Sequence, residues 1–189
     1  MTNPLQKDLE SGRFIVTAEI APPRGADFDS LTAAAEILKP AVSAVNLTDG
    51  AGAQVRMSSL AAAIHLKQMN VEPIMQMTCR DRNRIAIQSD LLGAAAFGIS
   101  NVLALAGDNI AAGDNKDAKG VFDFNSRDLL TVMRTMSEEK TTLSGAELST
   151  APNFFPAAAD APCDPTDDWA PDRLMEKHAA GARFVQTQY

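Results

Sequence analysis

The distribution of hydrophobic and polar positions predicts strands alternating with helices along the chain. Short apolar runs indicate buried strands, and apolar residues three to four positions apart indicate amphipathic helices. The expected strands cover residues 14–20, 41–50, 72–78, 101–107, 145–155 and 182–189. The expected helices cover residues 31–39, 57–68, 83–98, 126–136 and 172–181, after a short polar helix or coil at the N-terminus. Such alternation is typical of a parallel sheet covered by helices.

The segment from Glu72 to Asp108 shows this pattern most clearly, and we interpret it as one βαβ unit. An apolar run leads into Thr78, Arg80 and Asp81, an amphipathic helix follows, and a second apolar run stops at Asp108. The carboxyl ends of parallel strands open on the same side of a sheet. We therefore expect these polar side chains to line one face.

Polar residues also end the first two expected strands. Glu19 precedes a Pro-Pro pair that forbids further ladder bonding, and Asn46, Thr48 and Asp49 end the second strand. Polar groups at nearly every strand end favour a barrel over an open sheet. The predicted fold class is therefore α/β, a TIM-type (β/α)8 barrel of which about six βα units are present.

A complete barrel of this type takes about 250 residues, so about two βα units are missing from these 189 residues. We expect a single barrel domain over residues 1–189 that lacks its last two units. There are two alternatives: a second chain covers the exposed edge of the sixth strand, or the sheet is open. Two segments, 109–125 and 156–171, are predicted to be long loops.

Composition narrows the possible partners. The net charge of −7 and the pI near 4.8 argue against nucleic acid and anionic membranes, which bind basic surfaces. No signal segment and no membrane span are expected, so the predicted location is cytoplasmic. The two cysteines, Cys79 and Cys163, lie far apart, which favours free thiols over a disulfide or zinc site.

Five segments carry a resemblance to a known family. They are AEIAPPRG (18–25), VNLTDG (45–50), MTCRDRNR (77–84), GISNVLALAGD (98–108) and AGARFVQTQY (180–189). Together they make the chain similar to the flavin-dependent 5,10-methylenetetrahydrofolate reductases, in particular the branch with CRDRN after the third strand. The resemblance implies a (β/α)8 barrel with flavin at its C-terminal face.

The resemblance also implies a reaction. NADH or NADPH reduces a bound flavin, which then reduces 5,10-methylenetetrahydrofolate to 5-methyltetrahydrofolate. Glu19 matches the catalytic glutamate that protonates the folate N10, and burial at a barrel mouth would favour its protonated form. Asp108 matches an aspartate close to flavin and pterin, and Gln188 matches a glutamine that touches the substrate. The structural alternatives are a Glu19–Arg24 ion pair, a turn at Asp108 and an exposed chain end at Gln188.

The family's cofactor contacts fall on further residues. Thr48, Gln76, Thr78, Gly107 and Asp108 match flavin contacts, Arg80, Asp81 and Asn83 belong to the CRDRN signature, and Lys177 matches a lysine near the adenylate. An arginine beside a helix start could bind diphosphate, although the signature could equally cap and brace that helix. Lys177 could equally be a solvated helix residue. FAD is the expected cofactor, with FMN as the alternative.

Two other classes of function stay open. Glu19, Asp49 and Asp108 could gather a divalent cation, as in a metal-dependent TIM-barrel lyase, although no metal site is our expectation. The chain could also be a non-catalytic partner or remnant that binds folate or flavin without turnover. The expected partners are the folate substrate and, beyond it, a second copy or a partner subunit.

Overall fold

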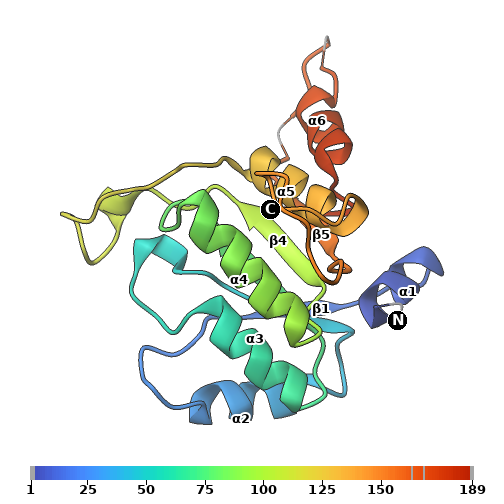
Figure 1. Cartoon of the computed structure of the whole chain (residues 1–189). Coiled ribbons are helices and arrows are strands. Elements are labelled where there is room, and N and C mark those ends of the chain that lie inside the picture. Colours follow the sequence, from blue (N-terminus) through green and yellow to red (C-terminus); the bar gives the residue numbers. More distant parts are fainter. Residues whose placement is uncertain (1–2, 163, 168, 188–189) are drawn as a thin grey trace.

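The structure is a computed structural model, and it describes residues 3–162, 164–167 and 169–187. Helices and strands alternate along the chain as the sequence predicts (Figure 1). The strands are β1 (Thr17–Ile20), β2 (Ala44–Leu47), β3 (Pro73–Thr78), β4 (Asn101–Leu105), β5 (Phe155–Asp160) and β6 (Phe184–Thr187). The α-helices are α1 (Pro4–Glu10), α2 (Asp29–Leu38), α3 (Ser59–Gln68), α4 (Arg84–Ala96), α5 (Ser126–Glu138) and α6 (Asp172–Ala180), and the short 3-10 helices are η1 (Ala51–Ala53) and η2 (Ile110–Ala112).

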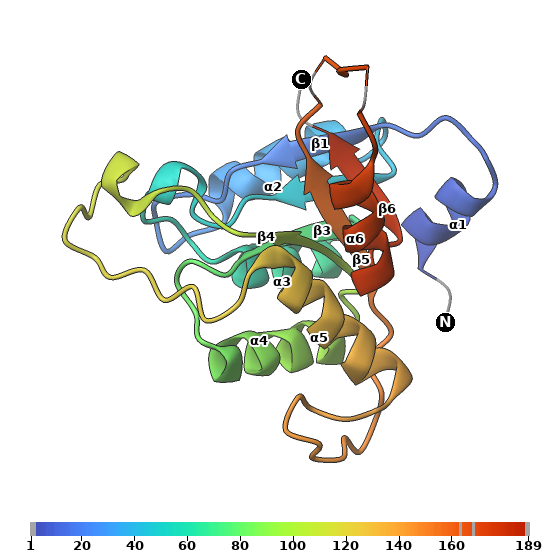
Figure 2. The same ribbon diagram turned by 90° about the horizontal axis from the view of Figure 1, so that it is seen from above.

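The six strands form one parallel sheet in the order β1-β2-β3-β4-β5-β6. Each strand pairs with the next one in the chain, which is the progression of a barrel and not that of a doubly wound sheet. The sheet is curled, and helices α2 to α5 cover its outer face (Figure 2). This half-barrel confirms the predicted fold class, a partial TIM-type (β/α)8 barrel.

Alternation along the strands divides the core into two clusters. Every second residue faces the outer helices, as Met75 and Met77 do on β3. The intervening residues face the inside of the curl, where Ile74 packs with Leu5 of α1. Helix α1 therefore covers the amino-terminal end of the inner face, and the carboxyl-terminal end of the same face is left for polar residues.

The predicted position of the fifth strand is wrong. We expected a strand over residues 145–155 and a loop from 156, but β5 is Phe155–Asp160. Pro156 and the alanines that follow it have low strand propensity, which made this segment resemble a loop. The pairing of β5 with β4 on one side and β6 on the other outweighs that propensity, and the proline lies at only the second position of the strand.

Other boundaries differ by a few residues. The first strand begins at Thr17 and not at residue 14, because Phe14 is exposed and lies outside the sheet. The described part of the last strand is Phe184–Thr187. Asn83 caps α4, and Asn125 caps α5 through a capping box with Asp128.

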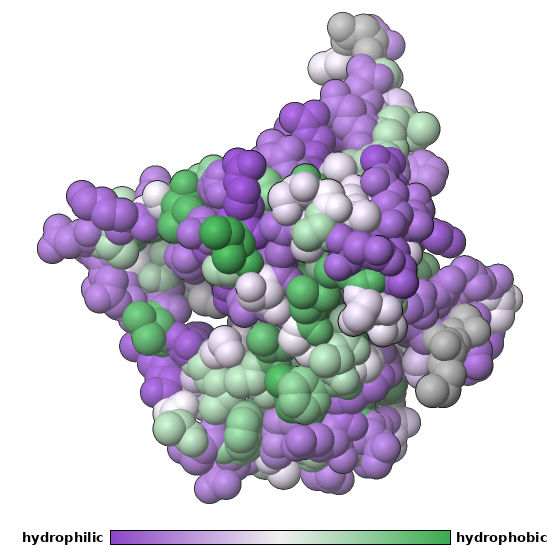
Figure 3. Space-filling model, in the orientation of Figure 1, coloured by the Kyte–Doolittle hydropathy of each residue, from purple (hydrophilic) through white to green (hydrophobic). Residues whose placement is uncertain are grey.

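The molecular surface is mixed. Figure 3 shows hydrophobic patches gathered over α3 and α4, where Ile85 and Leu92 are exposed, and hydrophilic surface over the projecting loops. Within the described residues no helix is both long and apolar enough to cross a membrane.

Candidate functional site

A cavity of about 440 Å³ lies at the carboxyl-terminal end of the inner face. Its volume is in the range of small-molecule sites. It collects residues from all six strands or the loops that follow them, namely Glu19, Asn46, Thr48, Asp49, Ala51, Gln76, Thr78, Leu103, Leu105, Ala106, Gly107, Asp108, Ala159, Gln186 and Thr187. We call it the strand-end cavity. The alternation that sends Ile74 inward also sends Gln76 and Thr78 inward.

Glu19 lies on the edge strand β1 and is exposed. The expectation that this carboxyl group is buried is therefore wrong, because β1 pairs only with β2 among the described residues. Its carboxylate Oε2 accepts a hydrogen bond from Gln76 Nε2 at 2.8 Å. Arg24, the ion-pair partner considered from the sequence, instead lies 3.7 Å from a carboxylate oxygen of Asp114 and donates to Gln54.

Two polar side chains of β2 and its end are buried in the cavity with an atom left unpaired. Thr48 Oγ1 and Asn46 Oδ1 have no hydrogen-bond partner among the described residues. The other end of Asn46 makes a long bond, from Nδ2 to the Ala18 carbonyl at 3.4 Å. A buried polar atom without a partner is costly, so unpaired atoms in a cavity indicate the contacts of a ligand.

Thr78 is buried and fully engaged within the protein. Its backbone N–H and its hydroxyl both donate to Asp49 Oδ2, at 2.8 and 3.0 Å. Asp49 thus joins the ends of β2 and β3, and it forms part of the cavity wall.

Gly107 and Asp108 follow β4 on the opposite wall. Gly107 has φ of +100°, and a Cβ atom there would lie 2.7 Å from Arg80 Cβ. Only glycine permits both the backbone conformation and the close approach of the two strand ends. Asp108 Oδ2 accepts from the Gly52 backbone N–H at 2.6 Å, which ties the β4 end to η1.

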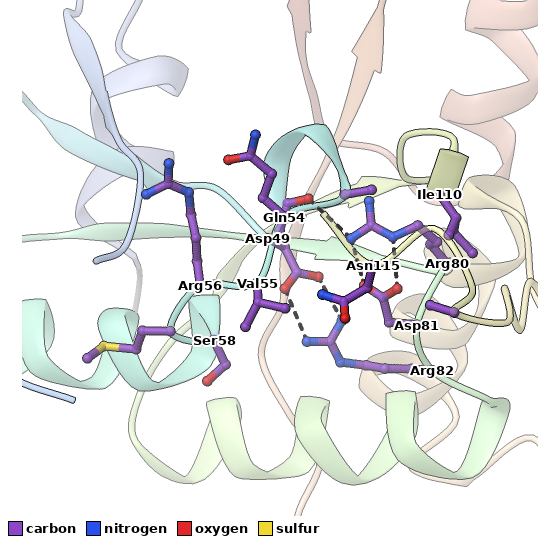
Figure 4. Close-up of a pocket in the computed structure, with 14 residues that line it drawn as sticks. Asp49, Gln54, Val55, Arg56, Ser58, Arg80, Asp81, Arg82, Ile110 and Asn115 are labelled. Atoms are coloured by element: carbon purple, nitrogen blue, oxygen red, sulfur yellow. Dashed lines mark hydrogen bonds and ion pairs between the residues drawn. The ribbon is translucent and has the colours of Figure 1, made fainter. Parts of the chain in front are cut away.

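A second cavity, of about 390 Å³, lies on the other side of η1 and contains most of the CRDRN signature (Figure 4). We call it the arginine cavity. Arg80 is 3% exposed and makes a bidentate bond to Asp81, with Nε and Nη2 at 2.8 and 2.7 Å from its oxygens. Nη2 also donates to the Gly50 carbonyl at 3.2 Å. The hydrogen bond to Asp81 raises the pKa of Arg80, so this guanidinium stays charged.

Arg82 bridges two carboxylates in the same region. It donates to both oxygens of Asp49, at 2.7 and 3.1 Å (Figure 4). It also donates to Asp90 at 2.9 Å. Burial opposes its charge, but the Asp49 and Asp90 carboxylates outweigh burial and raise the pKa of Arg82. Burial raises the pKa of the neighbouring Cys79 thiol to about 11. The negative charge of Asp128 raises it as well, and the positive charge of Arg82 lowers it. The thiol is therefore protonated at neutral pH.

Comparison with known families decides the relationship. The model of the methylenetetrahydrofolate reductase family matches residues 4–189. The chain belongs to the methylenetetrahydrofolate reductase family. A search among curated proteins finds no match. Membership of this family supports a folate-reducing oxidoreductase activity and agrees with the barrel-type fold.

The structure brings only part of the predicted site together. Glu19, Thr48, Gln76, Thr78, Gly107 and Asp108 all line the strand-end cavity. Arg80 and Asp81 line the arginine cavity instead. Asn83 accepts from the backbone N–H groups of Ile85 and Ala86 as the cap of α4. The six predicted residues that line the strand-end cavity form the compact core of the candidate site.

Of the remaining predicted residues, Lys177 lies apart from that core. Lys177 Nζ donates to the Ala159 carbonyl at 2.5 Å and to Asp160 Oδ1 at 3.2 Å, so it binds the end of β5. Gln188 lies outside the described residues, and its proposed contact with substrate stays a prediction.

The cavity also contains residues to which the sequence alone gave no binding role. Asn46 and Gln186 line it, one on β2 and one on β6. Each lies two positions before a residue that we did assign, Thr48 or Gln188. The two-residue period of a strand places such pairs on one face, so the period was a usable signal for both.

The carboxylates do not converge on a cation site. Each of the three carboxylates accepts hydrogen bonds from different residues of the protein. Glu19 accepts one from Gln76, and Asp108 accepts one from the Gly52 backbone. Asp49 accepts hydrogen bonds from Arg82 and Thr78. Within the described ranges no group of three or more His, Cys, Asp or Glu residues could hold a metal ion. The arrangement needed by the metal-dependent alternative is not formed by these three residues.

Proposed function

We propose that this protein reduces 5,10-methylenetetrahydrofolate to 5-methyltetrahydrofolate through a bound flavin that NADH or NADPH reduces. The observation that carries the proposal is the strand-end cavity, in which unpaired buried polar atoms of Asn46 and Thr48 lie beside Glu19 and Asp108. Its size and its mixed apolar and polar lining suit a flat heterocyclic ring. The family match supports the folate substrate.

The residues of the cavity fit a flavin. The Thr48 hydroxyl can donate or accept and the Asn46 Oδ1 can accept, so ring or ribityl polar atoms would complete both. Thr78 and the Gly107 backbone would form the wall beside them. Bound there, the flavin would supply a two-electron relay between the nicotinamide and the folate. FAD is the cofactor we favour over FMN.

The residues outside the cavity would hold the remainder of the cofactor. We assign Arg80, Asp81 and Asn83 to the diphosphate side and Lys177 to the adenylate side, as the family resemblance implies. In this structure these four residues bind protein groups. Contacts with the cofactor would require an extended molecule that reaches out of the cavity toward the arginine cavity and toward Lys177. The cavity residues carry the proposal.

Glu19 would deliver the proton that opens the five-membered ring of the substrate at N10. The Gln76 amide donates a hydrogen bond to Glu19 Oε2. No hydrogen bond to Glu19 Oε1 occurs within the described residues, so Oε1 is available to carry that proton. Asp108 would place a negative charge near the ring system. There it would disfavour an anionic reduced cofactor and stabilise a cationic folate. Gln188 would contact the pterin.

The experiment is to replace Glu19 by Gln and to measure the two half-reactions separately under anaerobic conditions. We expect flavin reduction by NADH within about twofold of wild type and reoxidation by methylenetetrahydrofolate slowed by about a hundredfold or more, because only the second step needs the N10 proton. A matched control is Glu36→Gln on the outer helix α2, away from the cavity. Equal loss of both half-reactions would contradict this role of Glu19.

A further inference from the structure

We infer that Gln76 is a positioning residue for the Glu19 carboxyl group and not a flavin contact. The inference rests on the proposed function. It replaces the flavin contact that the family resemblance implies for Gln76. The structure instead directs its amide to Glu19, with Nε2 2.8 Å from Oε2.

The strand register explains why Gln76 can reach Glu19 across an intervening strand. Glu19 pairs with Asn46 on β2, and Asn46 pairs with Ile74 on β3. Gln76 is the next inward-facing residue after Ile74, so its side chain has to cross β2 diagonally. The Gln76 and Glu19 side chains extend toward each other over β2 and meet there, and an asparagine, one methylene shorter, would end farther from Glu19.

The two partners differ in how firmly they are held. Glu19 is exposed on an edge strand, and no other side chain in the described part of the chain hydrogen-bonds its carboxylate. Gln76 is 8% exposed in a strand paired on both sides, and its backbone carbonyl accepts from Ser59 Oγ of α3 at 2.7 Å, which holds the strand at this position. The buried residue therefore holds the exposed one in place, and a proton donor must be positioned in this way to act on a substrate.

The chemistry of the amide then determines which oxygen of Glu19 works. The Gln76 N–H bond is made to Oε2, so Oε2 acts as an acceptor and the proton must reside on Oε1. An amide does not titrate, so the support is the same in both protonation states of the carboxyl group. Loss of this bond would leave Glu19 folded in place but free to rotate away from N10.

The test replaces Gln76 by Leu and by Asn and measures flavin binding and both half-reactions. We expect the Kd for FAD and the rate of flavin reduction by NADH to stay within about twofold of wild type. Reoxidation by methylenetetrahydrofolate should fall about tenfold or more in both variants, as expected for a lost hydrogen bond to a charged group. The Asn variant keeps an amide in the cavity, so it carries the test if the Leu variant does not fold.

A double-mutant cycle separates positioning from a general structural effect. In a Glu19→Gln background, Gln76→Leu should cause no further loss of the reoxidation rate, because Gln76 acts only through Glu19. An additive loss would overturn the inference. The control is Gln68→Leu, an exposed glutamine on α3, which should match wild type in each assay.

Other outcomes are equally decisive. Weaker FAD binding by the Gln76 variants with an unchanged reoxidation rate would show that Gln76 is a flavin contact, and the inference would be wrong. If wild-type protein binds neither FAD nor FMN, the proposed function fails first and the role of Gln76 fails with it. Normal wild-type turnover with normal turnover of both Gln76 variants would overturn the inference alone.

Discussion

The strand-end cavity and the arginine cavity are neighbours that share Asp49, yet they differ in how their polar groups are satisfied. In the arginine cavity, Arg80 and Arg82 make bidentate or bridging bonds to carboxylates of the same chain. In the strand-end cavity, Thr48 and Asn46 keep buried atoms that lack a partner within the described residues. The first pattern is that of a structural brace, and the second is that of a site waiting for a ligand.

The difference shows that a concentration of charged residues does not by itself mark the groups left free for a ligand. The CRDRN signature is the most conspicuous charged sequence of the protein. Most donors of its arginines form ion pairs and hydrogen bonds that join β2, β3 and α4. One nitrogen, Arg80 Nη1, remains buried without a partner in the described structure. In the strand-end cavity the groups left free are the less conspicuous Thr48 hydroxyl and Asn46 amide oxygen, two positions apart in the sequence. The comparison can be tested by variants that should affect only one of the two cavities.

The largest effect should follow from breaking the brace. Arg82→Leu would leave the Asp49 carboxylate, whose side chain is 6% exposed, without its charged partner. We expect the free energy of unfolding to fall by about 3 kcal/mol, as for other broken buried ion pairs. Urea unfolding measures it. Arg84→Leu is the matched control, because the ion pair of Arg84 with Asp123 is more exposed and should matter much less. Equal effects of the two variants would contradict the brace.

A smaller and different effect should follow from Thr48→Val and Thr78→Val. The Thr48 hydroxyl is unpaired, so its removal should leave stability unchanged and weaken FAD binding about tenfold. The Thr78 hydroxyl donates to Asp49 at 3.0 Å, so its removal should lower stability by about 1 kcal/mol. Urea unfolding and a fluorescence titration with FAD give the two values. Loss of stability without loss of binding in Thr48→Val would reverse our view of the cavity.

The smallest effect concerns pH and the loop that covers the arginine cavity. Hydrogen bonds from the Arg84 side chain and backbone N–H lower the pKa of Asp123 to about 2. Because the folded-state pKa is depressed, this carboxylate stabilises the fold above the unfolded value of about 4, and its contribution is lost as pH falls toward 2. The stability difference between wild type and Asp123→Asn should shrink over that interval. A constant difference between pH 2 and pH 5 would contradict the pKa shift.

Much of this architecture was predictable from periodicity. Alternation along the strands and polar strand ends predicted a barrel-type sheet and placed Glu19, Thr48 and Asp108 at one face. The fifth strand was missed because Pro156 and three alanines carry no strand signal, and only pairing with both neighbours forms the strand. Local propensity contains no information about such pairing.

The hydrogen bonds of the site were harder to predict than its members. The Gln76–Glu19 bond crosses an intervening strand and depends on the register of three strands. The bonds of Arg80 and Arg82 depend on the backbone direction after β3. Gly50 after β2 and Gly107 after β4 leave room for Arg80 there. Sequence patterns placed these residues at the right end of the sheet, but their partners required the structure.

The central claim is that the strand-end cavity holds a flavin that passes electrons to folate. The most direct measurement is an anaerobic visible-absorbance titration of the protein with FAD and FMN, followed by NADH and then methylenetetrahydrofolate. We predict a bound oxidised flavin whose band bleaches with NADH and returns with the folate. A protein that takes up neither FAD nor FMN, or whose bound and reduced flavin does not respond to methylenetetrahydrofolate, would contradict the account.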